Sequence, residues 1–567
     1  MKPFFIRATV AAIAFTSALL SYGQPPSSSE VLSLNKTVTR DINPESSQFF
    51  SLHLKSADYV NGSITQQGKV SIAIYLPDNS VLRKFRAAPS DGKHSFAFAA
   101  EVAGDYKIEL TTDDKPARCE LRIDAITALD ERLQPEPWTD PNPSPRVEAL
   151  RRQIASGNTD TAPFWKQVAT EGTPLIEPYG KDGRYQLVTF LWRAMYETRS
   201  VFVRSPIRLP ELQLNDYAMH RLMNTDVWYL TVKIPSGAGF DYRISPNDPL
   251  VFDGPRSSQR AVTSQMDPLN PHRWSCDPQE SRFRCHSYAE LPGAAPRTWF
   301  VKKRGIAEGK IETKQLHSDI QKLDRTVAIY TPPDYQTKGR PNHLLVVFDG
   351  DDYLDDDTAM PTTLNNLIAG SKIPPTVAVM VYNVDGRRLK DLLLNQEFAD
   401  FMAKELMPWV REHYNVSTEA AQTVVIGHSA GGVAAVYMGL RYPGVFGNVL
   451  SQSGAVWWSP EMDLGNQDAT DEPNWLARQF IVSPTSAVRF YLEAGTFEVD
   501  TSGRGSGILE ANRQLREVLL AKGYEVHYQQ FVGGHDTVSW RGTLADGLLA
   551  LLGTKNKHPE QAAPPSK

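Results

Sequence analysis

A serine set between glycines follows a short apolar run at residues 424–432, which read Val-Val-Ile-Gly-His-Ser-Ala-Gly-Gly. A serine hydroxyl is a weak nucleophile, so it needs a base beside it and hydrogen-bond donors for the oxyanion. A G-x-S-x-G turn between a strand and a helix is typical of a nucleophile elbow, which exposes the serine. We therefore predict Ser429 as the nucleophile and the Ala430 amide as one oxyanion donor. His428 beside them either packs or lines the pocket.

An acid and a base follow the serine in the order that α/β-hydrolases use, each after a strand. Residues 488–492 predict a strand, and the next residues supply Glu493 and, beyond a glycine turn, Glu498. Residues 526–531 predict the following strand, and Gly-Gly-His-Asp comes directly after it. We assign His535 as the base and Glu498 as the carboxylate that orients its imidazole.

Other titratable residues near these positions have alternative explanations. Glu493 could replace Glu498, although its place at the strand end favours a structural role. Asp500 is a weaker rival for the same position. Asp536 is expected to anchor the loop of the histidine, and His527 lies inside a predicted strand.

A second oxyanion donor is expected from the loop after an earlier strand. Residues 344–348 predict that strand, and the loop after it offers the backbone N–H of Gly350 or Asp351. The acidic residues at 349–357 lack the spacing of a calcium loop. We therefore expect no metal and no cofactor.

Length and composition limit the possible functions. A chain of 567 residues is too long for one core, so several domains are expected. The 60 basic and 65 acidic residues give a net charge of -5, which predicts no nucleic-acid partner. Of the three cysteines, Cys276 and Cys285 could close a small loop, leaving Cys119 free and buried.

The first 23 residues have the features of an export signal. Lys2 and Arg7 precede an apolar run at residues 8–20, and small residues follow at 21–23. The run is short for a membrane span. We expect a cleaved signal peptide, a periplasmic or secreted protein, and no membrane span in the mature chain.

The remaining chain divides into two β-sandwich domains followed by an α/β-hydrolase domain. Residues 24–130 predict a small β-sandwich, because strand-like segments at 49–54, 59–66, 70–76, 94–98 and 106–111 alternate with turn residues. Residues 131–162 predict a proline-rich linker and a short helix at 147–155. A second β domain is expected at 163–300, the hydrolase at 301–556 and a disordered tail at 557–567.

Many short motifs in residues 163–552 resemble the enterochelin (enterobactin) esterase family. In the catalytic part they are Asp-Gly at 349–350, Asp-Gly-Arg-Arg at 385–388, the elbow, Ser-Gln-Ser-Gly at 451–454, Trp-Trp at 457–458, Gly-Gly-His-Asp at 533–536 and Trp-Arg at 540–541. Before it they include Val-Thr-Phe-Leu-Trp at 188–192, Thr-Asp-Val-Trp-Tyr at 225–229 and Asp-Pro-Leu-Asn-Pro at 267–271. The resemblance implies an immunoglobulin-like second domain. The first sandwich is similar to pre-peptidase C-terminal-like domains.

The resemblance implies hydrolysis of ester bonds in a catecholate siderophore trilactone, a small-molecule substrate. Such a ligand needs basic side chains and flat partners, and five residues could supply them: Arg387, Arg388, Arg541, Trp457 and Trp458. The tryptophans could instead be core residues, and the arginines could pair with carboxylates. A feruloyl or acetyl esterase acting on plant polysaccharide is the alternative activity, because one fold hosts both chemistries. A binding protein without turnover is a third possibility, which the intact Ser429, Glu498 and His535 disfavour.

Overall fold

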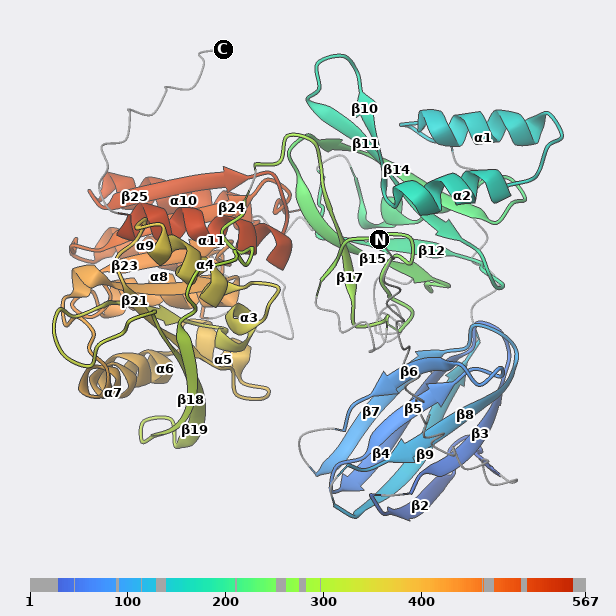
Figure 1. Cartoon of the computed structure of the whole chain (residues 1–567), viewed down its shortest axis with the longest axis horizontal. Coiled ribbons are helices and arrows are strands. Elements are labelled where there is room, and N and C mark those ends of the chain that lie inside the picture. The colour runs from blue at the N-terminus through green and yellow to red at the C-terminus, as the bar shows by residue number, and fades with distance from the viewer. Residues whose placement is uncertain are drawn as a thin grey trace, which may run out of the picture. The chain divides into compact units, whose positions relative to one another are not determined.

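The computed structural model describes most of the chain in separate stretches, namely residues 29–44, 46–87, 91–113, 115–128, 139–209, 212–250, 262–274, 282–295, 297–460, 462, 474–500 and 507–553. The chain divides into two compact units, of which the first ends at Thr127 (Figure 1). The expected signal at 1–23 and tail at 557–567 lie outside the described residues, as do residues 131–138 at the start of the proline-rich linker. In the described part of the chain, no helix is long and apolar enough to cross a membrane.

The first unit is a sandwich of two β-sheets. Among the described residues, one sheet has the order β1 (Glu30–Val31), β3 (Gln48–Leu54), β8 (Gly104–Thr111), β5 (Ser71–Tyr75) and β6 (Val81–Phe85). The other has the order β2 (Thr37–Ile42), β9 (Ala117–Thr127), β4 (Tyr59–Gln67) and β7 (Gly92–Ala99). Alternate residues of each strand are buried, as in Phe50, Leu52 and Leu54, because successive side chains point to opposite faces. The five predicted strands are present, and β1, β2, β6 and β9 are additional.

The second unit begins with two helices that pack on a second β domain. Helix α1 (Pro145–Ala155) starts with a proline after Ser144, whose hydroxyl accepts a hydrogen bond from the Val147 N–H, and α2 (Ala162–Glu171) follows. The described strands form two sheets, β10 (Leu175–Tyr179), β11 (Tyr185–Arg193), β14 (Val227–Pro235) and β13 (His220–Arg221), and β12 (Val201–Arg204), β15 (Gly239–Pro246), β17 (His286–Glu290) and β16 (Arg273–Trp274). Phe190 of one sheet packs against Tyr242 of the other, with ring centroids 4.9 Å apart.

A mostly parallel sheet organises the rest of the second unit. Its described strands have the order β18 (Lys310–Ser318), β19 (Leu323–Thr331), β21 (Thr376–Val381), β20 (His343–Val347), β22 (Thr423–His428), β23 (Asn448–Gln452), β24 (Arg489–Gly495) and β25 (Glu525–Phe531). Strand β19 pairs antiparallel with both β18 and β21, and the other neighbouring strands pair in parallel. Strand β22 is buried along its whole length, because helices cover both faces of the sheet.

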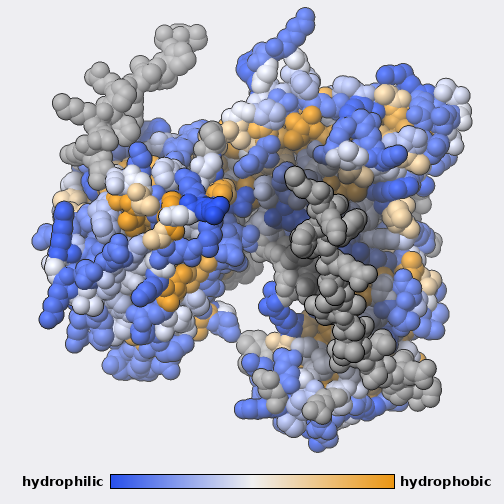
Figure 2. Space-filling model, viewed as in Figure 1, coloured by the Kyte–Doolittle hydropathy of each residue, from blue (hydrophilic) through white to orange (hydrophobic). Residues whose placement is uncertain are grey.

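The two faces of this sheet carry separate hydrophobic cores. On one face the core includes Val425 and residues of helices α6 (Gln396–Phe401), α7 (Met407–His413), α8 (Ala430–Arg441), α9 (Trp475–Val482) and α10 (Ile508–Ala521). On the other it includes Val424, Ile426 and residues of α3 (Gly350–Leu354), α4 (Met360–Ala369) and α11 (Thr537–Leu552). Helix α5 (Arg388–Leu392) and a π-helical turn (Met402–Leu406) complete this part. The face visible in Figure 2 is mostly hydrophilic, with small scattered apolar patches.

The second β domain and the catalytic part share direct contacts within this unit. The Gly239 N–H donates to the Val532 carbonyl at 3.2 Å, and Gly239 forms an isolated bridge with Gly533. Phe497 of the catalytic part belongs to the hydrophobic core of the β domain. These contacts place strand β15 beside the loop that follows β25.

The cysteines have different states. Cys119 is free and buried, and its burial raises the pKa of the thiol to about 11. Cys285 is disulfide-bonded, and Cys276, its predicted partner, lies outside the described residues.

Candidate active site

The turn at Ser429 has the strained backbone of a nucleophile elbow. Ser429 has φ 56° and ψ -119°, which L-residues rarely adopt, and it lies between β22 and α8. A Cβ at Gly427 would lie 2.3 Å from the backbone of Gly431, so position 427 requires glycine. The Ser429 N–H donates to the Gln452 carbonyl at 3.0 Å, which fixes the turn on the neighbouring strand.

The structure brings the three predicted triad residues into one hydrogen-bonded chain. His535 Nε2 lies 2.9 Å from Ser429 Oγ, and His535 Nδ1 lies 2.6 Å from Glu498 Oε1. The Glu498 side chain is 1% exposed, and its Oε2 accepts the Gly495 N–H at 2.6 Å. Because the carboxylate accepts the Nδ1 proton, Nε2 is left to accept the serine proton. The arrangement can therefore generate a serine nucleophile.

Glu493 occupies a different environment from Glu498. It is fully buried, and its carboxylate accepts hydrogen bonds from Gln452, Thr543 and Tyr491. Burial raises the pKa of Glu493 to about 7, although these hydrogen bonds oppose the rise. Glu493 is thus part of a polar network beneath the site, and Glu498 is the carboxylate that contacts the histidine.

Asp536 and His527, which were not predicted as triad members, contact other residues. Asp536 is the N-cap of α11 and accepts the Ser539 N–H at 2.8 Å. Burial, followed by the charge of Asp241, raises the pKa of Asp536 well above its usual value. His527 lies on β25, 3.3 Å from the Glu525 carboxylate.

An aromatic stack lies against the predicted base, His535. The Trp540 ring meets the His535 ring edge to face, with centroids 4.8 Å apart. The His428 ring stacks on Trp540, with centroids 4.4 Å apart and 12° between the ring planes. The indole N–H donates to Ser453 Oγ at 2.9 Å. Burial lowers the pKa of His428 to about 4, so its ring is neutral near pH 7. His428 therefore packs against Trp540 as an uncharged ring.

The predicted oxyanion loop begins with a strained, buried aspartate. Asp349 has φ 51° and precedes α3, whose first residues are Gly350 and Asp351. The amides that open α3 and α8, including that of Ala430, are first-turn N–H groups that a helix leaves without an internal acceptor. A Cβ at Gly350 would lie 2.5 Å from the Met380 carbonyl carbon, so the loop packs tightly on β21.

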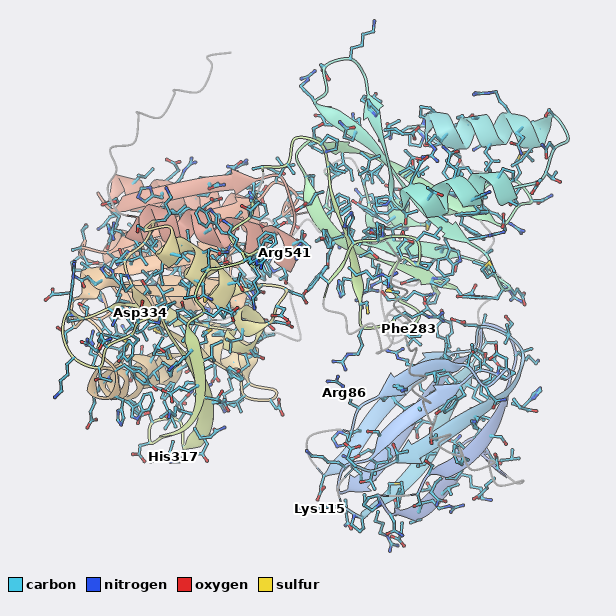
Figure 3. All side chains as sticks on the ribbon, in the orientation of Figure 1. Arg86, Lys115, Phe283, His317, Asp334 and Arg541 are labelled. Atoms are coloured by element: carbon cyan, nitrogen blue, oxygen red, sulfur yellow. The ribbon has the colours of Figure 1, made fainter. Side chains whose placement is uncertain are left out.

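The residues predicted to bind substrate have other contacts in the structure. Arg388 hydrogen-bonds through two nitrogens to Asp349, and Arg387 pairs with Asp391 at 3.0 Å. Arg541, which is labelled in Figure 3, is only 9% exposed. Its guanidinium lies 4.9 Å from the centre of the Tyr288 ring and 4.7 Å from the centre of the Phe300 ring.

Trp458 is buried in the core of the catalytic part, and Trp457 is half-buried and packs edge to face against it at 5.8 Å. The structure therefore gives Arg388, Arg541 and Trp458 contacts within the protein, and a role of the five residues in substrate binding stays a prediction.

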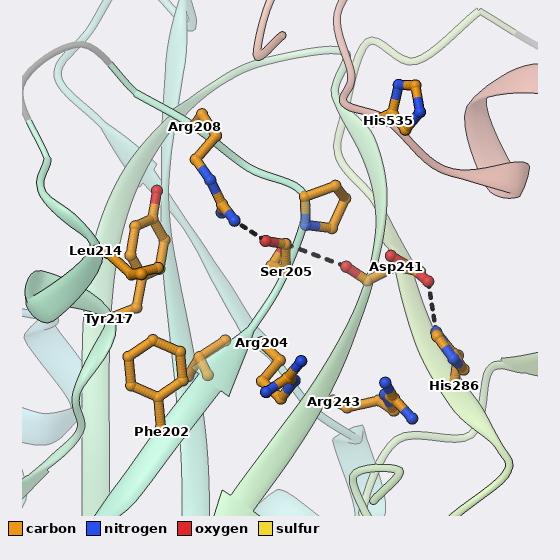
Figure 4. A pocket seen from close by; sticks show the side chains of 12 residues that line it. Phe202, Arg204, Ser205, Arg208, Leu214, Tyr217, Asp241, Arg243, His286 and His535 are labelled. Atoms are coloured by element: carbon orange, nitrogen blue, oxygen red, sulfur yellow. Dashed lines mark hydrogen bonds and ion pairs between the residues drawn. The ribbon is translucent and has the colours of Figure 1, made fainter. Parts of the chain in front are cut away.

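A cavity of about 380 Å³ adjoins His535. Apart from His535, the residues that line it come from the second β domain: Phe202, Val203, Arg204, Ser205, Pro206, Arg208, Leu214, Tyr217, Asp241, Arg243 and His286 (Figure 4). The sequence does not predict these contacts, because they depend on how β15 meets the loop after β25. The sequence does show that Asp241 and Arg243, two residues apart on one strand, point to the same face of the sheet.

The sequence matches two described families over much of the second unit. Residues 187–300 match the enterochelin esterase N-terminal family, and residues 318–551 match the putative esterase family. The first match covers most of the second β domain, and the other spans all three triad positions.

Individual relatives and solved structures agree with these matches. The iron(III) enterobactin esterase of Dickeya dadantii is 30% identical over 430 residues, which are 70% of this chain and 94% of the relative. The iron(III) salmochelin esterase of Escherichia coli O6:H1 is 28% identical over 72% of this chain and 98% of its own length. A crystal structure of the enterobactin esterase from Shigella flexneri in the presence of enterobactin has a TM-score of 0.54 and 27% identity, covering 69% of this chain and 97% of its own.

Proposed function

The chain belongs to the enterochelin esterase family, and we propose that it is a serine esterase that hydrolyses the ester bonds of a catecholate siderophore trilactone. The observation that carries this proposal is the hydrogen-bonded chain from Glu498 through His535 to Ser429. It supports covalent catalysis by the serine, and the named relatives act on esters of this class.

The geometry supports a two-step reaction. Ser429 Oγ attacks the ester carbonyl carbon while His535 Nε2 takes the serine proton, and Glu498 stabilises the resulting imidazolium. The carbonyl oxygen becomes an oxyanion, for which the Ala430 amide and the amide of Gly350 or Asp351 are the proposed donors. The intermediate then breaks its bond to the leaving alkoxide, which receives the proton from His535.

Water completes the reaction. His535 takes a proton from the water, whose oxygen attacks the acyl-serine ester, and the bond to Ser429 Oγ breaks with return of that proton. Each cycle therefore adds one water to the substrate. A cyclic trilactone opens to a linear acid in the first cycle and is shortened in later ones.

The second domain favours a siderophore over a plant polysaccharide. Its residues 187–300 match the N-terminal domain that enterochelin esterases carry, and it contributes most of the cavity beside His535. A feruloyl or acetyl esterase remains the alternative activity, and we further propose that the chain is exported through a cleaved signal at residues 1–23.

Mass spectrometry of the products tests the proposed activity. The full-length mature protein is incubated separately with enterobactin, its ferric complex and a feruloylated oligosaccharide. We expect products of enterobactin that gain the mass of one water per cleaved ester, with none from Ser429→Ala. Release of ferulate without hydrolysis of enterobactin would replace the proposal with the polysaccharide activity.

A further inference from the structure

Trp540 on helix α11 lies against His535 without being a member of the triad. Its indole ring meets the imidazole edge to face, with centroids 4.8 Å apart and 89° between the ring planes. Trp540 is only 7% exposed, and it is not among the residues that line the cavity beside His535. It therefore contacts the predicted base from inside the protein and not from the side of the cavity.

The hydrogen bonds of the triad do not restrain the His535 imidazole in every direction. They hold its two nitrogens, Nδ1 to Glu498 Oε1 at 2.6 Å and Nε2 to Ser429 Oγ at 2.9 Å. Rotation of the ring about the line through these nitrogens leaves both distances unchanged. Once Ser429 Oγ is acylated it has no proton to donate, so of these two hydrogen bonds only the one to Glu498 remains. A contact on the ring itself restrains both movements.

Three hydrogen bonds fix the position of Trp540. Its indole N–H donates to Ser453 Oγ at 2.9 Å, and its main-chain carbonyl accepts a hydrogen bond from Gln452 Nε2 at 2.9 Å. Its main-chain N–H donates to the Asp536 carbonyl at 3.2 Å. A tryptophan combines a large flat ring with one N–H donor, so the same side chain can pack against a ring and hold a defined orientation.

The residues that anchor Trp540 also hold the nucleophile. The main-chain carbonyl of Gln452 accepts the Ser429 N–H at 3.0 Å, while the side-chain amide of Gln452 donates to Trp540. Ser453 directly follows Gln452 at the end of β23. His428, at the end of β22, directly precedes Ser429 and stacks on the indole ring. The same two strand ends therefore set the positions of Trp540 and of Ser429.

The hydrogen bond to Ser453 distinguishes this arrangement from simple packing. Ser453 is fully buried, and in the described part of the chain its hydroxyl bonds only to the indole N–H. An apolar ring could fill the same space without needing a buried acceptor. A satisfied hydrogen bond in the interior selects one orientation of the indole, and that orientation is the one that meets His535.

We propose that Trp540 is a positioning residue that keeps the His535 imidazole aligned with Ser429 Oγ through the catalytic cycle. It transmits the position of the nucleophile turn, through Gln452, Ser453 and His428, to the ring of the base. The reacting groups are thus held in a productive geometry before substrate binds. This inference rests on the proposed function and goes beyond it, because Trp540 itself takes no proton and touches no substrate.

The kinetic test uses the full-length mature protein and p-nitrophenyl acetate. We expect Trp540→Leu to lower kcat about tenfold or more, because the ring contact with His535 is lost. Trp540→Phe keeps a ring without the N–H, and Ser453→Ala keeps the indole without its acceptor, so each should lower kcat about threefold. Ser453→Ala leaves the volume of Trp540 in place and keeps the test valid if Trp540→Leu does not fold.

Trp409→Leu is the matched control. Trp409 on α7 is half-buried and also packs on a histidine ring, that of His413, with centroids 4.7 Å apart. Its ring contacts among the described residues are with His413 and Tyr414, neither of which belongs to the triad. This variant should change kcat less than about twofold. A loss of kcat equal to that of Trp540→Leu would overturn the positioning role.

Two further measurements ask whether Trp540 acts through His535. On a Ser429→Ala background, Trp540→Leu should leave the Kd for enterobactin within about twofold, because the indole does not line the cavity. On a His535→Ala background, Trp540→Leu should change the residual rate less than about twofold, since the residue that it positions is absent. A further loss on that background, or a rise in Kd as large as the fall in kcat, would contradict the proposal.

The outcomes distinguish this inference from the proposed function. Hydrolysis of enterobactin with unchanged kcat in Trp540→Leu and Ser453→Ala would overturn the positioning role and leave the function intact. Hydrolysis of p-nitrophenyl acetate but not of enterobactin would overturn the function, while the kinetics of the variants would still decide the role of Trp540. Absence of both activities in the unmodified protein would overturn both.

Discussion

Arg388 holds the Asp349 carboxylate through two parallel hydrogen bonds, from Nε to Oδ1 at 2.6 Å and from Nη2 to Oδ2 at 2.7 Å. Asn383 donates to the same Oδ1 at 2.8 Å. Burial alone would raise the pKa of Asp349, but the Arg388 guanidinium and these hydrogen bonds hold it below its usual value. Because Asp349 precedes the proposed oxyanion amides, Arg388 acts as a positioning residue.

Replacing Arg388 should therefore impair chemistry more than binding. Arg388→Ala is expected to lower kcat about tenfold or more with little change in KM, since misplaced donors stabilise the transition state less. Arg388→Lys should recover only part of the loss, because a lysine cannot donate in parallel to both oxygens. Steady-state kinetics measure both. The exposed Lys390 on the same helix provides the control Lys390→Ala. Equal losses in kcat with the control would contradict the assignment.

The two nearby glutamates should differ in their effect on catalysis. Glu498→Gln is expected to lower kcat by about two orders of magnitude or more, because the His535 imidazolium loses its carboxylate partner. Glu493→Gln should change kcat by only a few-fold, since Glu493 contacts no triad residue among its hydrogen bonds. Both variants are assayed with p-nitrophenyl acetate. The reverse order of damage would make Glu493 the catalytic acid.

Glu493 also predicts a dependence of stability on pH. Its pKa rises from 4.5 to about 7 on folding, so the folded state binds the proton more tightly. This contribution is fully present below pH 4.5 and is lost as the pH rises through about 7. Glu493→Gln removes the ionisable group, so its free energy of unfolding relative to the unmodified protein should improve by about 1 to 3 kcal/mol between pH 5 and pH 8.

Urea unfolding followed by loss of esterase activity measures this difference at the two pH values. Glu525→Gln, which alters a carboxylate with 57% exposure on the neighbouring strand, is the matched control. A difference that is the same at both pH values would show that Glu493 is ionised throughout this range.

Export predicts a shortened mature chain. If residues 1–23 are a cleaved signal, the protein recovered from the periplasm or the medium should begin near Gln24. Intact-mass measurement of the exported protein decides this. Retention of Met1 in a membrane fraction would identify the segment as an anchor.

The triad could be predicted from sequence because each member follows a strand of a parallel sheet. Such strands end at the same edge, so Ser429, Glu498 and His535 were expected to meet despite their separation along the chain. Strand β9 was missed although Cys119, Leu121 and Ile123 alternate with exposed or half-buried residues. The alternation of apolar and polar residues was therefore enough to predict this strand.

The substrate contacts could not be predicted in the same way. Arg388 and Arg541 carry the positive charge that an anionic ligand needs. In the structure, however, Arg388 pairs with Asp349, and the Arg541 guanidinium lies over the rings of Tyr288 and Phe300. The arginines that line the cavity lie near His535 because the second β domain contacts the loop after β25. Sequence gives the charge of a side chain, whereas its availability depends on neighbours that only the fold brings together.

The backbone contact between Gly239 and the loop after β25 makes the position of His535 depend on both parts of the second unit, the β domain and the catalytic part. A Cβ at Gly533 would lie 3.1 Å from the Gly239 carbonyl oxygen, and one at Gly495 would lie 2.4 Å from the Gly533 carbonyl oxygen. Three glycines thus allow the strand edge of one domain to support the segment that carries His535. If the β domain and the catalytic part were separated, Ser429 would keep its turn, but the segment that carries His535 would lose its contact with Gly239. The contact between the β domain and the catalytic part thereby becomes a condition for the placement of His535, even where the central sheet stays intact.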